Sequence, residues 1–394
     1  MEIDMLENTK GTIIKVVGVG GAGGNAVQHM INKGVLGVEF IVANTDAQAL
    51  ENSQAHNVIQ IGASGLGAGM KPAVGRQLAE ETRGRIEDAL RGAHMVFIAA
   101  GMGGGTGTGA APIVAQVAKE MGALTVAVVS KPFSYEGQKC MDIANEGLEE
   151  LSQHVDSLIV ILNEKLEDIY EDGSMMEWLQ HADNVLNNAV AGIAEIINVP
   201  GHINVDFNDV KTIMGEQGKA MMGTAVASGL DRARIAAEQA VASPLLDGVD
   251  LAGARGVLVN VTASRGLKGK EIKEVMATVR AFAAEDASIA QGIAYDDNMG
   301  DEIRVTVVAT GLGRARKAPT LVATPMPVLR TGTHNEPIAA GTAGHAAGVS
   351  RHTFEGKRTP AVWRRESASE TVRAMERNGT ETYDIPAFLR RQAD

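Results

Sequence analysis

The chain has 394 residues, which is enough for two domains and additional segments. A formal net charge of −12 argues against a general nucleic-acid-binding protein, and an aromatic content of 3% argues against base-stacking platforms. The single cysteine, Cys140, excludes an intrachain disulfide and a cysteine-based metal cluster, and fits a reducing, cytoplasmic compartment. The N-terminus lacks the apolar core of a signal peptide, and no apolar run reaches the ~20 residues of a membrane helix.

Residues 13–33 predict a strand, a glycine-rich turn and a helix. The turn has the spacing of a dinucleotide-binding site at Gly18, Gly20 and Gly23, which is weak evidence when it stands alone. A second predicted strand, 38–43, ends at Asn44-Thr45-Asp46, and Asp46 suits the ribose-binding acid of a nicotinamide enzyme. A loop at 65–72 then precedes an amphipathic helix over about 74–90, and its own residues favour a plain turn.

A second glycine loop occupies residues 101–109, between a buried strand at 94–100 and a helix over 110–121. Six of its nine residues are glycine, more than a strand-to-helix junction needs. Such a loop can turn several backbone N–H groups toward one phosphate, and the following helix N-terminus adds positive potential. The loop contains no lysine, so it is not a Walker A loop, and backbone dipoles with a metal ion must balance the phosphate charge. A nicotinamide enzyme would leave this loop unexplained.

Two more buried strands are predicted at 124–130 and 157–162, with a helix over 134–151 between them. Strands alternating with helices predict a parallel, doubly wound, Rossmann-like sheet that binds ligands at the carboxyl ends of its strands. Every loop described above leaves such an end, so the loops can converge on one site.

A long helix is predicted from Met175 to about Val199, with one apolar stripe suited to joining two domains. Asp206 and Asp209 follow it and share a face of a helical turn. Without further information, two acids in the first turn of a helix are expected only to complement the helix dipole. Residues 251–310 then predict strand, helix and two strands, an α+β domain that contains no glycine loop.

The composition changes over residues 314–380, where apolar periodicity is lost and a disordered, rather basic linker is expected. The last segment, 383–392, is apolar again and suits docking to a partner.

The run Gly103-Gly104-Gly105-Thr106-Gly107-Thr108-Gly109 resembles the signature loop of the tubulin and FtsZ GTPases. Further stretches resemble the bacterial FtsZ family in the same order: the Gly18 loop, residues 44–50, 65–69, 201–209 and 384–389. The resemblance implies a GTP-binding domain at 1–174, a core helix at 175–200 and an α+β C-terminal domain at 201–313. A linker at 314–380 and a partner-binding tail at 381–394 complete this division.

The resemblance also implies GTP or GDP contacts from the first turn, the signature loop and the strand ends. Glu136 corresponds to a ribose contact, and the Asp183 carboxylate would accept hydrogen bonds from guanine N1–H and its amino group. The expected nucleotide contacts are Gly20, Gly21, Ala22, Gly23, Gly24, Asn25, Asn44, Gly69, Gly101, Gly103, Gly104, Gly105, Thr106, Gly107, Thr108, Glu136, Cys140, Asn163, Leu179 and Asp183.

Asp206, Asp209 and Asn204 match the family's catalytic segment, which in that family reaches the nucleotide of the next subunit. The resemblance therefore implies a catalytic role for the two acids in place of an interaction with the helix dipole. Two positions depart from many relatives: Cys140 stands where an arginine is common, and Leu179 where a phenylalanine stacks on guanine. These departures bear on nucleotide affinity and leave the signature loop and the acids untouched.

The resemblance therefore implies a GTPase that polymerises head to tail in the division ring at midcell, with Mg²⁺ as the expected metal. The expected partners are other copies of the chain, division adaptors such as FtsA and ZipA, and regulators such as MinC. The tail residues expected to bind them are Asp384, Ile385, Pro386, Phe388 and Leu389. Direct nucleic-acid binding is not expected, and the membrane would be reached only through adaptors. The alternatives are an NAD-dependent oxidoreductase and a scaffold that carries nucleotide without hydrolysing it.

Overall fold

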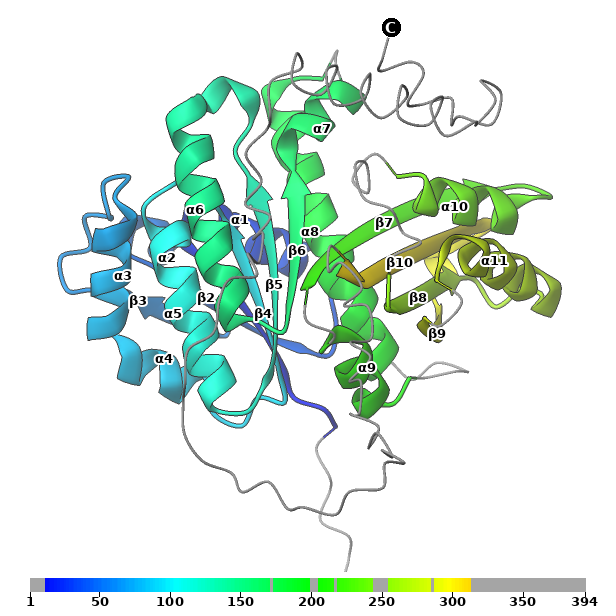
Figure 1. Cartoon of the computed structure of the whole chain (residues 1–394), viewed down its shortest axis with the longest axis horizontal. Helices are drawn as coiled ribbons and strands as arrows, with labels where there is room; N and C mark the ends of the chain where they lie inside the picture. The colour runs from blue at the N-terminus through cyan, green and yellow to red at the C-terminus, as the bar shows by residue number, and fades with distance from the viewer. Residues whose placement is uncertain are drawn as a thin grey trace, which may run out of the picture. The chain divides into compact units, whose positions relative to one another are not determined.

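The fold is built on one sheet, seen in a computed structural model that describes residues 11–170, 173–198, 205–215, 218–243, 254–284 and 287–312 (Figure 1). The strand order is β3-β2-β1-β4-β5-β6-β7-β10-β8-β9. In the first half the elements are β1 (Ile14–Val19), α1 (Gly20–Asn32), β2 (Val38–Asn44), α2 (Ala47–Glu51), β3 (Asn57–Gln60), α3 (Pro72–Glu81), α4 (Arg83–Leu90), β4 (Met95–Gly101), α5 (Thr106–Glu120), β5 (Leu124–Lys131), η1 (Ser134–Glu136), α6 (Gln138–His154), β6 (Ser157–Leu162) and α7 (Asn163–Ile169). The second half contains α8 (Met175–Asn198), α9 (Phe207–Met214), β7 (Gly218–Ser228), α10 (Arg232–Val241), β8 (Gly256–Ala263), α11 (Gly269–Phe282), β9 (Ser288–Tyr295), η4 (Asp297–Met299) and β10 (Glu302–Leu312).

The strands from β3 to β6 are all parallel, which confirms the predicted doubly wound sheet. Their apolar residues alternate between two cores because successive side chains of a strand point to opposite faces. Val16, Phe97 and Val126 face α1 and α8, whereas Val17, Ile98 and Ala127 face α4, α5 and α6. Parallel pairing brings the carboxyl ends of the strands to one edge of the sheet, and the predicted loops leave from that edge.

The second half continues the same sheet as a mixed α+β unit, as predicted. β7 pairs with β6 in parallel, while β10 is antiparallel to both β7 and β8. α8 packs against strands of both halves, through Val190 and Ile193 among others. Helices α10 and α11 cover the other face with alanine and valine side chains. The long helix therefore joins the two halves through one continuous core.

Two expected helices are each interrupted in the structure. The helix expected over 74–90 is broken at Thr82, whose hydroxyl donates to the Leu78 carbonyl and accepts the Gly62 N–H. The helix expected over 134–151 is a short 3₁₀ turn followed by α6, with Gly137 between them. Local hydrogen bonding at these two points replaces a continuous helical ladder.

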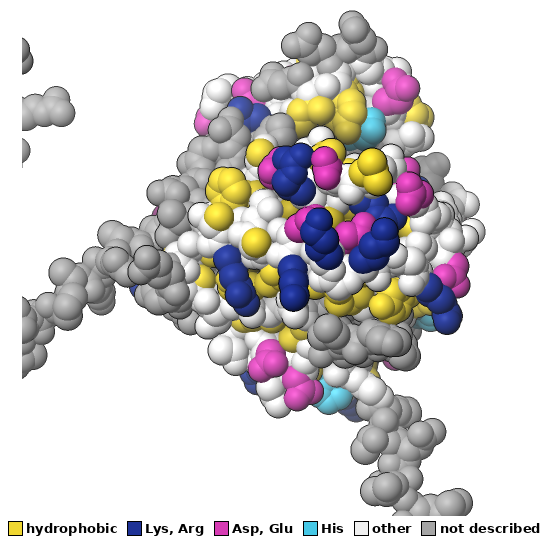
Figure 2. Space-filling view, turned by 90° about the vertical axis from the view of Figure 1, so that its right-hand side faces the viewer, with side chains coloured by type: hydrophobic (Ala, Val, Ile, Leu, Met, Phe, Trp, Pro, Cys, Tyr) yellow, Lys and Arg dark blue, Asp and Glu magenta, His cyan; other side chains and the backbone are white. Residues whose placement is uncertain are grey.

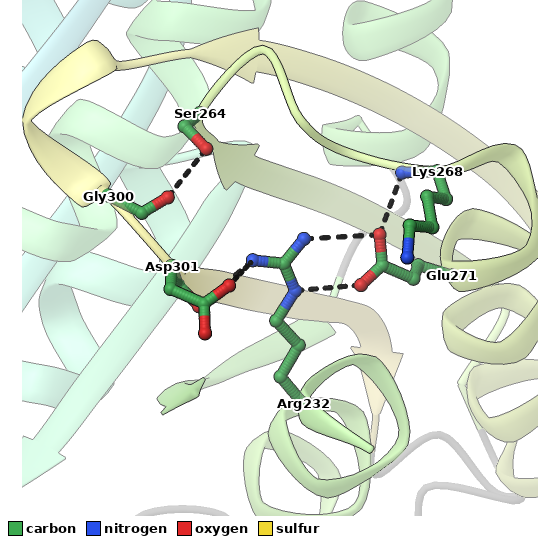
Figure 3. Close-up of polar contacts among 6 residues, drawn as sticks. All are labelled: Arg232, Ser264, Lys268, Glu271, Gly300 and Asp301. Carbon is green, nitrogen blue, oxygen red and sulfur yellow. Dashed lines mark hydrogen bonds and ion pairs between the residues drawn. The ribbon is translucent and has the colours of Figure 1, made fainter. Parts of the chain in front are cut away.

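Arg232 is a buried cation that ties together α10, α11 and the turn before β10 (Figure 3). Its Nε and Nη2 donate to the Glu271 carboxylate at 2.7 and 3.2 Å, and its Nη1 donates to the Asp301 carbonyl oxygen and Oδ1 at 2.9 and 3.1 Å. These bonds hold the pKa of Glu271 below its usual range. Figure 2 shows basic and acidic side chains interspersed on one face of the molecule. On α10, Arg234 forms exposed ion pairs with Asp231 and Glu238.

We expect Arg232→Ala to lower the free energy of unfolding by about 3 kcal/mol, because it leaves the Glu271 carboxylate, whose side chain is only 13% exposed, without its partner. Arg234→Ala is the matched control, since the Arg234 side chain is 51% exposed and its ion pairs contribute only ~0–1 kcal/mol. Urea unfolding followed by circular dichroism measures both. Equal losses for the two variants would contradict a special role for Arg232.

No helix in the described part of the chain is long and apolar enough to cross a membrane. The expected linker at 314–380, the tail at 381–394 and Asn204 lie outside the described residues.

Candidate nucleotide site

The first turn joins β1 to α1 and combines packed glycines with open ones. A Cβ on Gly23 would collide with the Ala99 carbonyl oxygen, so this glycine lets α1 lie against β4. Gly21 has no atom within 4 Å of such a Cβ, and with Ala22 and Asn25 it is exposed. The first turn of α1 contains no acidic residue and no side-chain cap. Its free N–H groups and helix dipole therefore favour an anion at Gly20–Gly24.

The second glycine loop joins β4 to α5 and is closed by its own hydrogen bonds. The Gly103 N–H donates to Thr108 Oγ1 at 2.9 Å, and the Met102 N–H donates to the Ser130 carbonyl at 2.9 Å. Gly103 has a φ of +101°, and a Cβ there would lie 2.6 Å from the Pro132 ring. Gly104 is different, because nothing lies within 4 Å of its Cβ position. The loop is rigid, and Gly104 is its open face.

Direct contacts bring the glycine loops together at one point. The hydroxyls of Thr45 and Thr106 are 2.6 Å apart, which joins the end of β2 to the start of α5. A Cβ on Gly20 would lie 3.0 Å from the Gly107 nitrogen, so the two helix N-termini meet there. The predicted convergence of the loops that follow β1, β2 and β4 is thus present.

The loop at 65–70 belongs to this junction as well. A Cβ on Gly105 would lie 2.9 Å from the Lys71 nitrogen and 3.2 Å from that of Met70. Met70 lies in a turn and has a φ of +56°, which is uncommon for a residue other than glycine, and Gly69 beside it is exposed and open. This corrects the plain-turn interpretation of the loop, because its backbone packs against the signature glycines.

Three polar positions surround the junction on the strand ends. Asn44 is buried, and its Oδ1 accepts the Asp46 N–H at 3.3 Å. Asn163 is buried at the end of β6, and its Oδ1 has no hydrogen-bond partner among the described residues. Glu136 is exposed beyond β5, and one carboxylate oxygen accepts the Phe133 N–H at 2.9 Å. The second carboxylate oxygen of Glu136 has no hydrogen-bond partner in the described segments and could contact a ligand.

Cys140 is buried on α6, and its carbonyl oxygen lies 2.9 Å from a Cβ built on Gly103. On α8, Leu179 is 43% exposed and Asp183 lies one turn further on. Burial raises the pKa of Asp183 to about 6, and the nearby His29 partly opposes this rise. His29 itself is held by Asn184, with Nε2 and Oδ1 2.9 Å apart. Within the described part of the chain, no group donates a hydrogen bond to the Asp183 carboxylate, so it can accept bonds from a ligand.

Asp206 and Asp209 lie at the opposite edge of the sheet. Asp206 is the N-cap residue of α9, but its side chain forms no capping hydrogen bond. Both carboxylates are exposed. The ring of Phe207 on α9 packs edge-on against His94, which directly precedes β4 at its amino end. Figure 1 shows α9 and α7 at opposite ends of the parallel strands. The length of β4 alone, seven residues, separates the acids from Thr106 by roughly 20 Å.

Comparisons with known proteins identify the family of the chain. Residues 13–171 match the Tubulin/FtsZ family GTPase domain, and residues 218–313 match the FtsZ family C-terminal domain. The chain is 50% identical over 404 residues to the cell division protein FtsZ of Pseudomonas aeruginosa, covering 99% of this chain and 100% of that protein. The chain belongs to the FtsZ family.

Other FtsZ proteins and their structures support the assignment. FtsZ of Coxiella burnetii is 58% identical over 304 residues, covering 76% of this chain and 79% of its own length. A solved structure described as an empty FtsZ dimer of M. jannaschii has 44% identity and a TM-score of 0.74, covering 78% of this chain and 90% of that one. CetZ2 of Haloferax volcanii has the same fold at 20% identity, with a TM-score of 0.64 and coverage of 77% and 95%.

One contact residue was missed in the sequence. Thr45 is 1% exposed and forms the hydroxyl contact to the signature loop, although only its neighbour Asn44 was expected at the site. Its position immediately after a strand end is the signal that could have identified it.

Proposed function

We propose that this chain binds GTP at the carboxyl edge of its parallel sheet, hydrolyses it to GDP and phosphate, and polymerises head to tail during cell division. The observation that carries the proposal is the junction of two helix N-termini, with open space beside Gly21 and Gly104. Membership of the FtsZ family supports GTP as the nucleotide and makes the NAD-dependent alternative unnecessary. The cytoplasmic division ring at midcell is the corresponding location.

The nucleotide lies across the junction in one orientation. Phosphates contact Gly20–Gly24 and the loop from Gly101 to Thr108, with Gly69 and Asn44 beside them. The ribose contacts Glu136, with Cys140 and Asn163 near it. The base lies against Leu179 and is recognised by Asp183. Asn25 contacts the nucleoside from the start of α1.

The active site is completed between two subunits. Asp206 and Asp209, with Asn204, reach the nucleotide of the next copy and orient the attacking water. The separation of the acids from the glycine loops within one chain supports this, because a head-to-tail contact joins opposite edges of two copies. A polymer is then needed for rapid hydrolysis.

Mg²⁺ suits this site as a companion of the phosphates. No group of three or more acidic, histidine or cysteine side chains suited to a metal occurs within the described residues. Mg²⁺ commonly keeps several waters and uses substrate phosphates with few protein oxygens, so such a group is not required. The hydroxyls of Thr45 and Thr106, 2.6 Å apart, are uncharged oxygens at the phosphate loop that could contact the ion. Bound there, the ion would neutralise phosphate charge.

The concentration dependence of hydrolysis tests the proposal. GTP turnover per molecule should rise steeply above a threshold protein concentration, and pelletable polymer should appear at the same threshold. A scaffold that carries nucleotide would show no turnover, and an oxidoreductase would bind NAD in place of GTP. Turnover per molecule that stays constant with concentration would contradict a subunit-spanning site.

The raised pKa of Asp183 predicts pH-dependent binding of GDP. Guanine recognition requires the carboxylate, so affinity should fall as the pH drops through about 6, approaching tenfold per pH unit below that value. Asp183→Asn is the control, because any remaining pH dependence in that variant belongs to the phosphates. Calorimetric titration with GDP from pH 5 to 8 measures both proteins. Parallel pH profiles would remove Asp183 from the base site.

The five-part division stands with this proposal: residues 1–174, 175–200, 201–313, 314–380 and 381–394. FtsA, ZipA and MinC are the proposed partners, through Asp384, Ile385, Pro386, Phe388 and Leu389. Asp384 can cap a short helix that Pro386 starts, and Phe388 with Leu389 would anchor it in an apolar groove. The membrane is reached only through such adaptors.

Deleting residues 383–394 is expected to abolish adaptor binding while leaving GTP hydrolysis and polymerisation unchanged. A helix this short is not stable alone, so it should fold only on a partner. Pelleting of full-length and truncated polymer with each adaptor is the measurement. Adaptor that still pellets with truncated polymer would contradict the assignment, and a loss of hydrolysis would place the tail in the folded core.

A further inference from the structure

Three aromatic side chains form a stack beside the nucleotide edge. Phe133 lies between Tyr135 and Trp178, with ring centroids 5.4 and 6.2 Å away and interplanar angles of 18° and 20°. Phe133 is 2% exposed, and Tyr135 is 52% exposed at the outer end of the stack. Aromatic residues make up only 3% of this chain, so their concentration at one place calls for a specific explanation.

Trp178 also fixes the connection between α7 and α8. Its indole N–H donates to the Tyr170 carbonyl oxygen at 2.7 Å, just after the end of α7. The Tyr170 ring lies flat against His181 on α8, with centroids 3.7 Å apart and an angle of 5°. Trp178 is half-buried, and a stacked aromatic ring with a satisfied N–H is a rigid anchor because few rotamers remain open to it. The first turns of α8 are therefore held from two directions.

Hydrogen bonds also fix the segment that carries Phe133 and Tyr135. The Phe133 N–H donates to Glu136, and both the N–H and the hydroxyl of Ser134 donate to the Glu167 carboxylate on α7. The segment 133–136 is thus bonded to α7, while Phe133 stacks on Trp178 of α8. One connected unit contains the residue proposed for the ribose and the helix that carries the residues proposed for the base.

We propose that Trp178 is a positioning residue for guanine recognition, which holds the α8 turn bearing Leu179 and Asp183 in register with Glu136. The inference rests on the proposed function and names the element that orders its base site. Leu179 directly follows Trp178, and Asp183 lies one helical turn after Leu179. Leu179 has no ring to stack on guanine. The position of the residues at the base site is therefore set by the Tyr135–Phe133–Trp178 stack. Trp178 need not contact the nucleotide.

Trp178→Leu tests this in the full-length chain, with Trp178→Phe as the conservative variant that keeps a ring. Phe282→Leu is the matched control, since Phe282 is a half-exposed aromatic on α11. The readout is the ratio of the dissociation constants of IDP and GDP. IDP lacks the 2-amino group that donates to Asp183 and keeps every other contact. The ratio therefore reports the placement of the Asp183 carboxylate, which a general loss of stability would not change.

We expect Trp178→Leu to lower the preference for GDP over IDP about tenfold, the value of one charge-assisted hydrogen bond. Trp178→Phe should keep most of the preference, and Phe282→Leu all of it. A Trp178→Leu protein whose ratio stays within twofold of wild type, whatever its melting temperature, would overturn the inference. Failure of the wild-type chain to bind GDP would overturn the proposed function itself, so the two failures are distinguishable.

Trp178 fluorescence gives a second, independent test. The chain has two tryptophans, Trp178 and Trp363, so Trp363→Phe leaves a single reporter. Saturation with GDP should shift or quench the Trp178 emission as the base orders α8 around the stack. An emission spectrum identical with and without bound GDP would contradict the coupling between the stack and the base site.

Discussion

Asp206→Ala is expected to lower GTP hydrolysis by about 100-fold or more while leaving GTP binding close to that of the wild-type chain. The reason is the placement of the acid. Asp206 lies at the amino edge of the sheet, exposed at the start of α9, and the glycine loops lie at the carboxyl edge. Removing the carboxylate leaves the glycine loops intact and removes a group that we propose orients water in the neighbouring subunit. Polymer should persist longer, because hydrolysis would no longer destabilise it.

Mixing two inactive variants separates a shared site from a site within one chain. Thr106→Ala damages the phosphate loop and keeps the acids, whereas Asp206→Ala does the reverse. In a mixed head-to-tail polymer, about a quarter of the contacts would join an intact loop to intact acids. Under polymerising conditions the mixture should therefore recover part of the hydrolysis that each variant lacks alone. A mixture as inactive as its components, with both variants present in the pellet, would contradict the shared site.

The parallel half of the fold was predictable because its local and global signals agree. The strands at 94–100 and 124–130 are continuous apolar runs, as strands buried on both faces should be, and each ends in a glycine or a polar break. The loops could be assigned to one edge because parallel strands all end there. The C-terminal strands at 256–263 and 288–295 were likewise predicted close to their observed bounds.

Strand β7 was not predicted, and the reason is physical. Its sequence is rich in glycine, alanine and methionine, which have weak strand propensity, and it lacks a clear alternation. The strand forms because β6 and β10 supply hydrogen bonds on its two edges. The Phe133–Trp178 stack could not be predicted from the sequence either. The two rings are 45 residues apart in the chain, and only tertiary packing brings them together.

The sequence also could not separate the glycines that pack from those that face a ligand. Gly104 and Gly107 belong to the same run, yet a Cβ on Gly107 would collide with the Gly101 carbonyl oxygen and one on Gly104 would meet nothing within 4 Å. This distinction depends on where β4 and α5 lie relative to each other. It also divides the signature loop into packed positions that shape the loop and one position, Gly104, with open space beside it.

We expect Gly107→Ala to lose both stability and nucleotide binding, and Gly104→Ala to lose nucleotide binding alone. The methyl group at 107 must push the start of α5 away from Gly101, an overpacking that costs about 1–3 kcal/mol and disperses the N–H groups of the loop. The methyl group at 104 enters free space, so the fold is unchanged while the approach of a phosphate is blocked. Gly84→Ala on α4 is the control, because that glycine is also open and is remote in sequence from the glycine loops.

Thermal unfolding without nucleotide, combined with GDP titration, distinguishes the three variants. Gly104→Ala should melt with the wild-type chain and bind GDP at least tenfold more weakly, since a displaced phosphate loses charge-assisted bonds to backbone N–H groups. Gly107→Ala should melt earlier, and Gly84→Ala should match the wild type in affinity. If Gly104→Ala bound GDP as tightly as the wild-type chain, the phosphates could not lie on the open face of the signature loop. The junction of Thr45 with Thr106 would then be a packing contact with no nucleotide beside it.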